Sequence, residues 1–162
     1  MAMAQATASL RAAASARAAL VAGVVISLDQ ITKHTIAAGI APGQEKKLLP
    51  GVHLVHVRNT GVAFSLFSGG GTLVLVFTLA ALALLILYFL RRPDRPWLWL
   101  PTGMLTGGAI GNLIDRIANG AVTDFIKLPH WPAFNVADMS ITFGVLVLLW
   151  VLEWGRERSP DR

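Results

Sequence analysis

Residues 72–90 form a continuous apolar run that contains no charged side chain. A run of this length can cross the hydrocarbon core of a bilayer as a helix, whereas a buried strand needs only a few residues. Over the whole chain, 54% of the residues are hydrophobic and only 14% are charged. This composition is too apolar for an ordinary soluble domain, so the sequence indicates a membrane protein.

Three more segments have the length and apolarity of a membrane span, namely residues 18–40, 97–115 and 138–154. Arginines end the second and fourth runs, and tryptophans typical of a membrane interface mark the start of the third. We therefore predict a membrane all-α bundle of four transmembrane helices, with residues 18–155 as a single domain.

The arginines of a four-span chain fall mainly on one side: near the N-terminus, between the second and third spans, and at the C-terminus. Basic residues are enriched on the cytoplasmic side of membrane proteins, so both termini are predicted to be cytoplasmic. Residues 1–17, which are rich in Ala and contain no acid, are predicted to be a disordered tail, and residues 156–162 a second tail. The same rule accounts for the formal net charge of +5, and we predict no nucleic-acid partner.

Residues 41–71 are the long stretch outside the spans that carries turn and strand signals. Pro42-Gly43 and Pro50-Gly51 are turn-forming pairs, and residues 53–57 and 62–67 resemble short strands. We predict a small extracytoplasmic β-sheet in this stretch.

The polar loop between the third and fourth spans contains an amphiphilic segment, residues 125–131. Apolar and polar side chains mixed in this way suit a segment that lies on the bilayer surface. We predict a short interfacial amphipathic helix there.

Two carboxylates, Asp115 and Asp138, lie at facing ends of the third and fourth spans. Asp115 continues a four-residue spacing of small residues, which on a helix form one stripe and let a neighbouring backbone come close: Gly103, Gly107 and Gly111. Asp115 is therefore predicted to face protein, where an ionisable group is expensive and usually functional. The alternative is an aspartate at a helix end that only reaches for the headgroups.

A pair of neighbouring aspartates can divide its protonation, so that one activates a water while the other polarises a carbonyl. This chemistry is peptide hydrolysis without a covalent intermediate, and the absence of cysteine excludes a thiolate nucleophile. Two alternatives remain: carboxylates that hold Mg²⁺ for phosphoryl transfer, and a proton or ion relay in a small transporter. His53 and His56 would lie on opposite faces of a strand, so we predict no metal site there, and no cofactor.

Five ordered motifs resemble those of the lipoprotein signal peptidases, also called signal peptidase II: Asp29-Gln-Ile-Thr-Lys33, Asn59-Thr-Gly-Val-Ala-Phe64, Gly107-Gly-Ala-Ile-Gly-Asn-Leu-Ile-Asp-Arg116, Val122-Thr-Asp-Phe125 and Phe134-Asn-Val-Ala-Asp138. The resemblance implies an aspartyl endopeptidase of the bacterial inner membrane, with its site facing outward. Its substrates would be diacylglyceryl-modified prolipoproteins, cut before the lipidated cysteine. It also implies contact with membrane lipid and inhibition by cyclic peptide antibiotics, and we expect a monomer.

The resemblance implies Asp115 and Asp138 as the catalytic pair. Residues expected to bind substrate or shape the site are Asp29, Lys33, Asn59, Gly61, Phe64, Gly111, Asn112, Arg116, Asp124 and Asn135. Two of these assignments have plain alternatives from the residues themselves. Asp29 and Lys33, four apart, could form an ion pair that neutralises only itself, and Phe64 could simply pack the sheet.

Overall fold

The computed structural model describes residues 1–60, 70–92 and 95–157 of the chain. Within these ranges there are four helices and three strands, in the order α1 (Ala2–Gly39), β1 (Glu45–Leu49), β2 (Val52–Asn59), α2 (Gly70–Arg91), α3 (Trp99–Asn119), β3 (Val122–Lys127) and α4 (Val136–Glu157). The expected strand at residues 62–67, and with it Gly61 and Phe64, lies outside the described residues.

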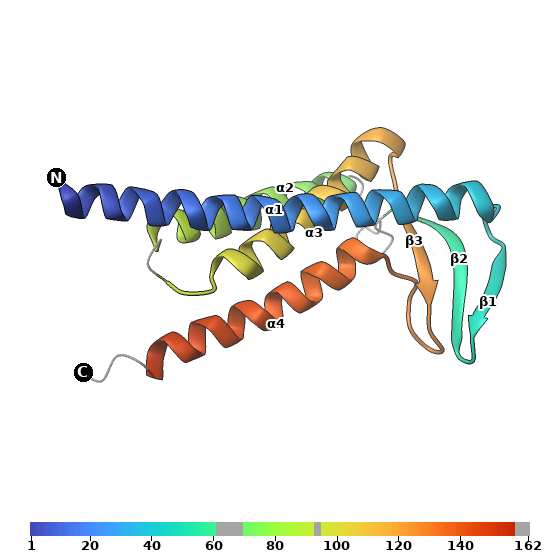
Figure 1. Ribbon diagram of the computed structural model, residues 1–162. Coiled ribbons are helices and arrows are strands. Elements are labelled where there is room, and N and C mark those ends of the chain that lie inside the picture. Colours follow the sequence, from blue (N-terminus) through green and yellow to red (C-terminus); the bar gives the residue numbers. More distant parts are fainter. Residues whose placement is uncertain (61–69, 93–94, 158–162) are drawn as a thin grey trace.

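The helices run roughly along one direction, with the sheet at one end and both chain termini at the other (Figure 1). α1 is the longest element and extends past the other helices on its N-terminal side (Figure 1). α3 is the central helix, because it packs extensively against both α1 and α4 and more lightly against α2. This arrangement brings the ends of α3 and α4 to the base of the sheet.

The prediction of a disordered tail over residues 1–17 is wrong, because α1 is helical from Ala2 onward. Alanine has the highest helix propensity of any residue, and the stretch contains neither Gly nor Pro to interrupt the helix. Tertiary packing also anchors α1 from Ala14 onward, where Ala14 and Ala18 join a cluster with Phe89 and Leu98.

Two described segments are long and apolar enough to cross a membrane, Thr7–Gly39 and Val136–Glu153. Val76–Arg91 forms a shorter apolar helix. α3 is less apolar along its length, since it contains glycines, Thr102 and Asn112. These residues are buried against neighbouring protein. The helical bundle is thus confirmed, while the count of four spans stays a prediction.

The predicted small sheet is confirmed as three antiparallel strands in the order β1-β2-β3. Pro50-Gly51 makes the β1–β2 turn, and Gly51 has φ 77°, a left-handed conformation that glycine adopts without strain. The third strand was not predicted. β3 pairs with β2 over His53↔Lys127 to Asn59↔Val122, with an irregularity between Leu54 and Val57.

β3 corrects the prediction of an interfacial helix at residues 125–131. Phe125 and Ile126 belong to the strand, and a turn follows at Pro129-His130. Phe125 is buried against Ile36 and Ile40 near the C-terminal end of α1. Phe125 and Ile126 therefore pack against the end of α1, whereas Trp131 at the end of the segment stays exposed.

The glycine stripe of α3 is the surface that lets α1 approach. An added Cβ at Gly103 would lie 2.6 Å from the Ala18 carbonyl oxygen, and one at Gly107 would lie 2.8 Å from Val25 Cβ. Both distances are shorter than any ordinary carbon contact, so the two backbones are close because these side chains are absent. Gly108, one position off the stripe, lies equally close to Ala137 of α4.

We expect Gly107→Leu to destabilise the protein by about 1–3 kcal/mol and to lower its activity, because the side chain must push α1 away from α3. Thermal unfolding in detergent and an activity assay on the same preparations measure the two effects. Gly23→Leu introduces the same side chain and is the matched control, since nothing lies within 4 Å of an added Cβ at that helical position. Equal behaviour of the two variants would contradict the packing role of the stripe.

Candidate active site

Asp115 and Asp138 lie at neighbouring ends of α3 and α4. Asp115, in the last turns of α3, is 4% exposed, and Asp138, in the first turn of α4, is half-buried. Asn112 lies one turn before Asp115 and donates from Nδ2 to Asp138 Oδ1 at 2.8 Å. The helix that carries the first carboxylate therefore also holds the second.

The start of α4 fixes the orientation of Asp138 through a reciprocal pair of hydrogen bonds. The backbone N–H of Asp138 donates to Asn135 Oδ1 at 2.9 Å, and the backbone N–H of Asn135 donates to Asp138 Oδ2 at 3.2 Å. This is the capping-box arrangement, with Asn at the cap and an acid three residues later. A helix N-terminus also favours negative charge, so the position suits a carboxylate.

Lys33 supplies positive charge at the centre of the site. Its Nζ lies 2.8 Å from Asp29 Oδ2, 3.2 Å from Asp115 Oδ2 and 3.0 Å from Asn112 Oδ1. These are three acceptors for the three N–H groups of an ammonium. An ion pair in which Asp29 and Lys33 neutralise only each other is therefore the wrong interpretation, because Lys33 also contacts Asp115.

Asp115 is bound by protein on both carboxylate oxygens. Oδ2 accepts from the backbone N–H of Thr123 at 2.9 Å in addition to Lys33, and Oδ1 accepts from Gln30 Nε2 at 3.2 Å. An aspartate that reached for headgroups would be exposed and free of such partners. The structure thus agrees with the sequence prediction that Asp115 faces protein.

Gln30 is a site residue that the sequence reasoning did not single out. Its amide lies within 3.2 Å of Asp29 Oδ2, the Gly111 carbonyl oxygen and Asp115 Oδ1. The available signal was its position between Asp29 and Lys33 in the first motif. Only the packing of α1 on α3 reveals that its side chain reaches Asp115.

Asp29 and Gly111 form the floor of the site between α1, α3 and α4. Asp29 is fully buried, and its Oδ1 accepts from the backbone N–H of Ala137 at 2.9 Å. An added Cβ at Gly111 would lie 2.7 Å from Asp29 Oδ2. Gly111 therefore leaves the space that the buried carboxylate occupies.

Asn135 and Asp124 connect the site to the sheet. Asn135 is fully buried, and its Nδ2 lies 2.8 Å from Asp124 Oδ1 and 3.2 Å from Asn112 Oδ1. Asn59, at the end of β2, donates from Nδ2 to Asp124 Oδ2 at 2.9 Å. The residues predicted from separate motifs are thus joined in one hydrogen-bonded network.

Burial raises the pKa of Asp124 from 3.8 to about 6; its hydrogen bond from Asn59 opposes the shift and the charge of Asp138 adds to it. Between about pH 4 and pH 6 the folded protein therefore holds a proton that the unfolded chain has released. The stability that Asp124 contributes is complete below about pH 4 and is lost as the pH rises through about 6.

We expect the carboxyl infrared band of Asp124 to disappear on deprotonation with a midpoint near pH 6. The band is assigned as the one missing from the spectrum of Asp124→Asn. In the wild type, the free energy of unfolding should fall between pH 4 and pH 6 more steeply than in that variant. A midpoint near the ordinary aspartate value would contradict the effect of burial.

Arg116 is the described residue of the predicted set that the structure does not bring to the carboxylates. Its Nη1 lies 3.4 Å from the Asn112 carbonyl oxygen of its own helix, and no contact with Asp115 or Asp138 is seen among the described residues. Asp29, Lys33, Asn59, Gly111, Asn112, Asp124 and Asn135 all lie in or against the network.

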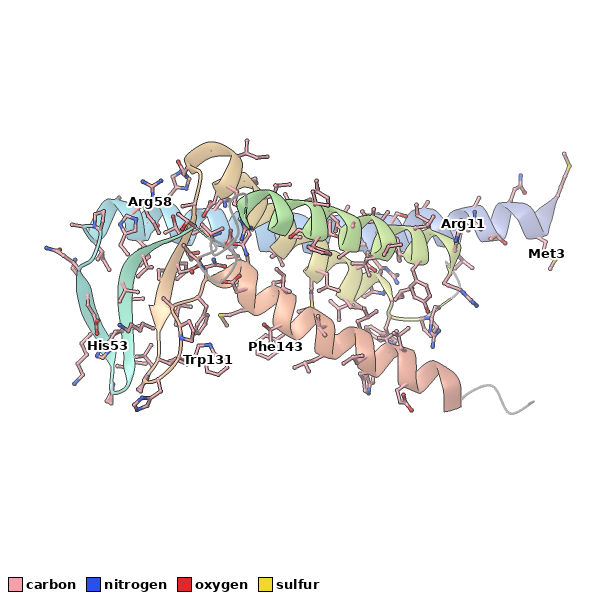
Figure 2. The ribbon with its side chains drawn as sticks, turned by 180° about the vertical axis from the view of Figure 1, so that it is seen from behind. Met3, Arg11, His53, Arg58, Trp131 and Phe143 are labelled. Carbon is pink, nitrogen blue, oxygen red and sulfur yellow. The ribbon has the colours of Figure 1, made fainter. Side chains whose placement is uncertain are left out.

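A cavity of about 310 Å³ opens beside Asp138. Its other walls are mainly apolar and include Trp131, Phe134, Met139 and Phe143. Figure 2 shows Trp131 and Phe143 near each other where the sheet end of the molecule meets α4. One carboxylate of the pair thus borders a space that a substrate can enter, while Asp115 lies deeper.

The comparisons with known proteins identify the family. Residues 21–153 match the family described as signal peptidase (SPase) II. Lipoprotein signal peptidase of Moorella thermoacetica is 41% identical over 145 residues, which cover 85% of this chain and 97% of that protein. The lipoprotein signal peptidase of Gloeobacter violaceus is 43% identical, over 87% of this chain and 84% of its own length.

Two solved structures, both titled as a bacterial membrane enzyme solved by the in meso method, have a similar fold. One, at 1.9 Å resolution, has a TM-score of 0.76 at 33% identity and covers 83% of this chain and 91% of its own. The other, at 2.3 Å resolution, has a TM-score of 0.78 at 30% identity, over 90% of this chain and 93% of its own. Because the family match covers most of the sequence and these relatives align over most of their length, the chain belongs to the signal peptidase II family.

Proposed function

We propose that this protein is an intramembrane aspartyl endopeptidase that removes the signal peptide from diacylglyceryl-modified prolipoproteins, cutting before the lipidated cysteine. Membership of the signal peptidase II family and the similarity to lipoprotein signal peptidases support the hydrolase activity and the prolipoprotein substrate. The observation that carries the catalytic assignment is the bonding of two carboxylates, Asp115 and Asp138, into one network through Asn112 and Lys33.

In the proposed reaction, one carboxylate takes a proton from water while the water oxygen attacks the scissile carbonyl carbon. The other carboxyl group gives its proton to the carbonyl oxygen as the C=O π electrons move onto it. A hydroxyl group of the tetrahedral gem-diol intermediate then gives its proton back to the second carboxylate as the C=O bond re-forms and the C–N bond breaks. The first carboxyl group gives the proton it took from water to the leaving amine. Asp138 borders the open cavity and Asp115 is buried, so the two carboxyl groups have the unequal surroundings that such a division of roles requires.

The remaining polar residues act by holding this pair. Asn112 and Asn135 orient Asp138, and Lys33 offsets the charge of Asp115. We propose that Asn59 and Asp124 align the sheet with the site, and that Gly61, Phe64 and Arg116 contact the substrate. A cyclic peptide antibiotic would compete for the same cavity, and the active protein would be a monomer.

The bundle is proposed to sit in the bacterial inner membrane as four spans, with both termini in the cytoplasm and the sheet outside. The substrate explains the location, because its acyl chains and signal helix stay in hydrocarbon while the scissile amide lies at the interface. Exposed apolar side chains along α1, α2 and α4 support membrane embedding.

A topology reporter fused after Arg92, between α2 and α3, is expected to score as cytoplasmic, because basic residues concentrate there and beside both termini. A second fusion after Gly51, in the β1–β2 turn, should score as external. An external score for the first fusion would contradict the proposed orientation.

The function is tested by incubating the purified protein with one prolipoprotein in two forms, with and without the diacylglyceryl group. The lipidated form should be cleaved before the modified cysteine, and the other should be cleaved poorly or not at all. Mass spectrometry of the products locates the cut. Equal cleavage of both forms would show that the enzyme does not require the diacylglyceryl group. Loss of activity on addition of a chelator would favour a metal-dependent mechanism instead.

A further inference from the structure

A second cavity lies at the end of the bundle opposite the sheet. Its volume is about 340 Å³, and it lies between residues 10–17 of α1 and the segment that leads into α3. Arg17 and Arg95 line it, together with Trp97 and Trp99. Positive charge and aromatic rings therefore meet in one hollow at the level where the helices end.

Both arginines contact neighbouring side chains or backbone, and each has N–H groups that these contacts do not use. The Arg17 guanidinium lies 5.8 Å from the centre of the Trp99 ring, a cation–π contact. Arg95 donates from Nη1 to Tyr88 Oη at 3.1 Å and from Nη2 to the Leu152 carbonyl oxygen at 2.8 Å. A guanidinium has five N–H donors, and in the described part of the chain neither arginine has a carboxylate partner.

The backbone next to these arginines is strained in a way that shapes the hollow. Trp97 has φ 64°, a left-handed conformation that is unfavourable for a bulky side chain. Its ring lies 6.0 Å from that of Trp99, centre to centre, and Trp97 as a whole is 49% exposed. Paired tryptophans at the ends of spans are typical of the headgroup level of a bilayer.

An exposed apolar stripe leads away from Arg17 along α1. It continues at steps of three or four residues on the same helix face through Leu20, Val24, Leu28 and Ile31, each at least half exposed. A basic cavity next to an apolar stripe is complementary to a phospholipid, which has a phosphate at one end and acyl chains at the other.

We propose that this cavity binds the phosphate headgroup of an anionic phospholipid, whose acyl chains lie along the apolar stripe of α1. Arg17 and Arg95 would donate charge-assisted hydrogen bonds to the phosphate oxygens, and the tryptophans would pack against the glycerol region. The site depends on the helices being embedded in a bilayer but not on which side the sheet faces. It uses no residue of the Asp115–Asp138 network, so it can fail while the proposed peptidase function stands.

The test is native mass spectrometry of the purified protein with phosphatidylglycerol and phosphatidylcholine of the same acyl chains. The wild type should retain phosphatidylglycerol in preference, and Arg17→Gln should lower that retention about fivefold, the effect of one basic residue at an anionic surface. Retention of phosphatidylcholine should not change, and Arg17→Lys should keep most of the preference.

Arg11→Gln is the matched control, because Arg11 lies on the same helix and the same end of the molecule but does not line this cavity (Figure 2). Equal losses in the two glutamine variants would overturn the site in favour of diffuse surface charge. Equal retention of the two lipids by the wild type would overturn it as well. Calorimetric binding of inorganic phosphate to the lipid-free protein, abolished by Arg17→Gln, would assign the site to a free anion and overturn the lipid as occupant.

Discussion

Asp138→Asn and Asp115→Asn are each expected to lower the rate of prolipoprotein cleavage by at least about 10³-fold while the protein remains inserted and folded. An amide cannot accept the proton of the attacking water, and it does not carry the acidic proton that the carbonyl oxygen needs. The rate is measured as release of signal peptide at saturating substrate, so that the loss is assigned to the chemical step and not to binding.

Asp138→Asn is expected to disturb the folded structure less than Asp115→Asn does. The Asp138 carboxylate accepts one side-chain and one backbone hydrogen bond, whereas Asp115 accepts three bonds, one of them from Lys33. Glu45→Gln is the control, because Glu45 is an exposed carboxylate on the sheet that contacts His53 and Lys127. Substantial turnover by Asp138→Asn with an unchanged unfolding temperature would rule out the aspartate pair.

Lys33→Met is expected to destabilise the protein by about 3–5 kcal/mol and to abolish activity, because it leaves buried carboxylates without a counter-charge. Lys33 is 3% exposed, and Asp29, its closest partner, is fully buried. Methionine keeps much of the volume of the lysine stem, so lost packing contributes little. Unfolding in mixed detergent micelles gives the free energy.

A double variant separates charge from packing. Asp29→Asn removes one of the two carboxylates that Lys33 contacts, so Lys33→Met combined with Asp29→Asn should be less destabilised than the sum of the single variants. It should not regain activity, because Asp115 still lacks its cation. Additive single effects would show that the ion pair itself has little energetic weight.

The sequence predicts the carboxylates and their helices well, because the physical signals are local. The four-residue spacing of small residues predicts the face of α3 that packs against a neighbouring helix. Asp115 lies four residues after Gly111, on the same face. Asp138 lies where the polar loop meets the fourth apolar run, which places it in the first turn of α4. These features need no knowledge of the tertiary fold.

The features that the sequence analysis missed or predicted wrongly depend on tertiary packing. β3 is a short strand whose apolar residues look amphiphilic in isolation, and only its pairing with β2 and its burial on α1 make it a strand. The N-terminal part of α1 carries few sequence signals beyond alanine, and its packing against the cluster around Phe89 begins only at Ala14. Gln30 reaches Asp115 across 85 positions of sequence, a contact that no local pattern encodes.

The two carboxylates of the proposed catalytic pair and the lysine that contacts one of them lie on three different helices, Lys33 on α1, Asp115 on α3 and Asp138 on α4. A growing chain that has delivered only α1 and α2 to the bilayer therefore holds the lysine without either carboxylate of the proposed pair. The proposed pair is complete only after α4 has left the ribosome and packed against α3. If Asp115 and Asp138 are the catalytic pair, as we propose, a chain that stops before α4 is expected to be inactive toward prolipoproteins.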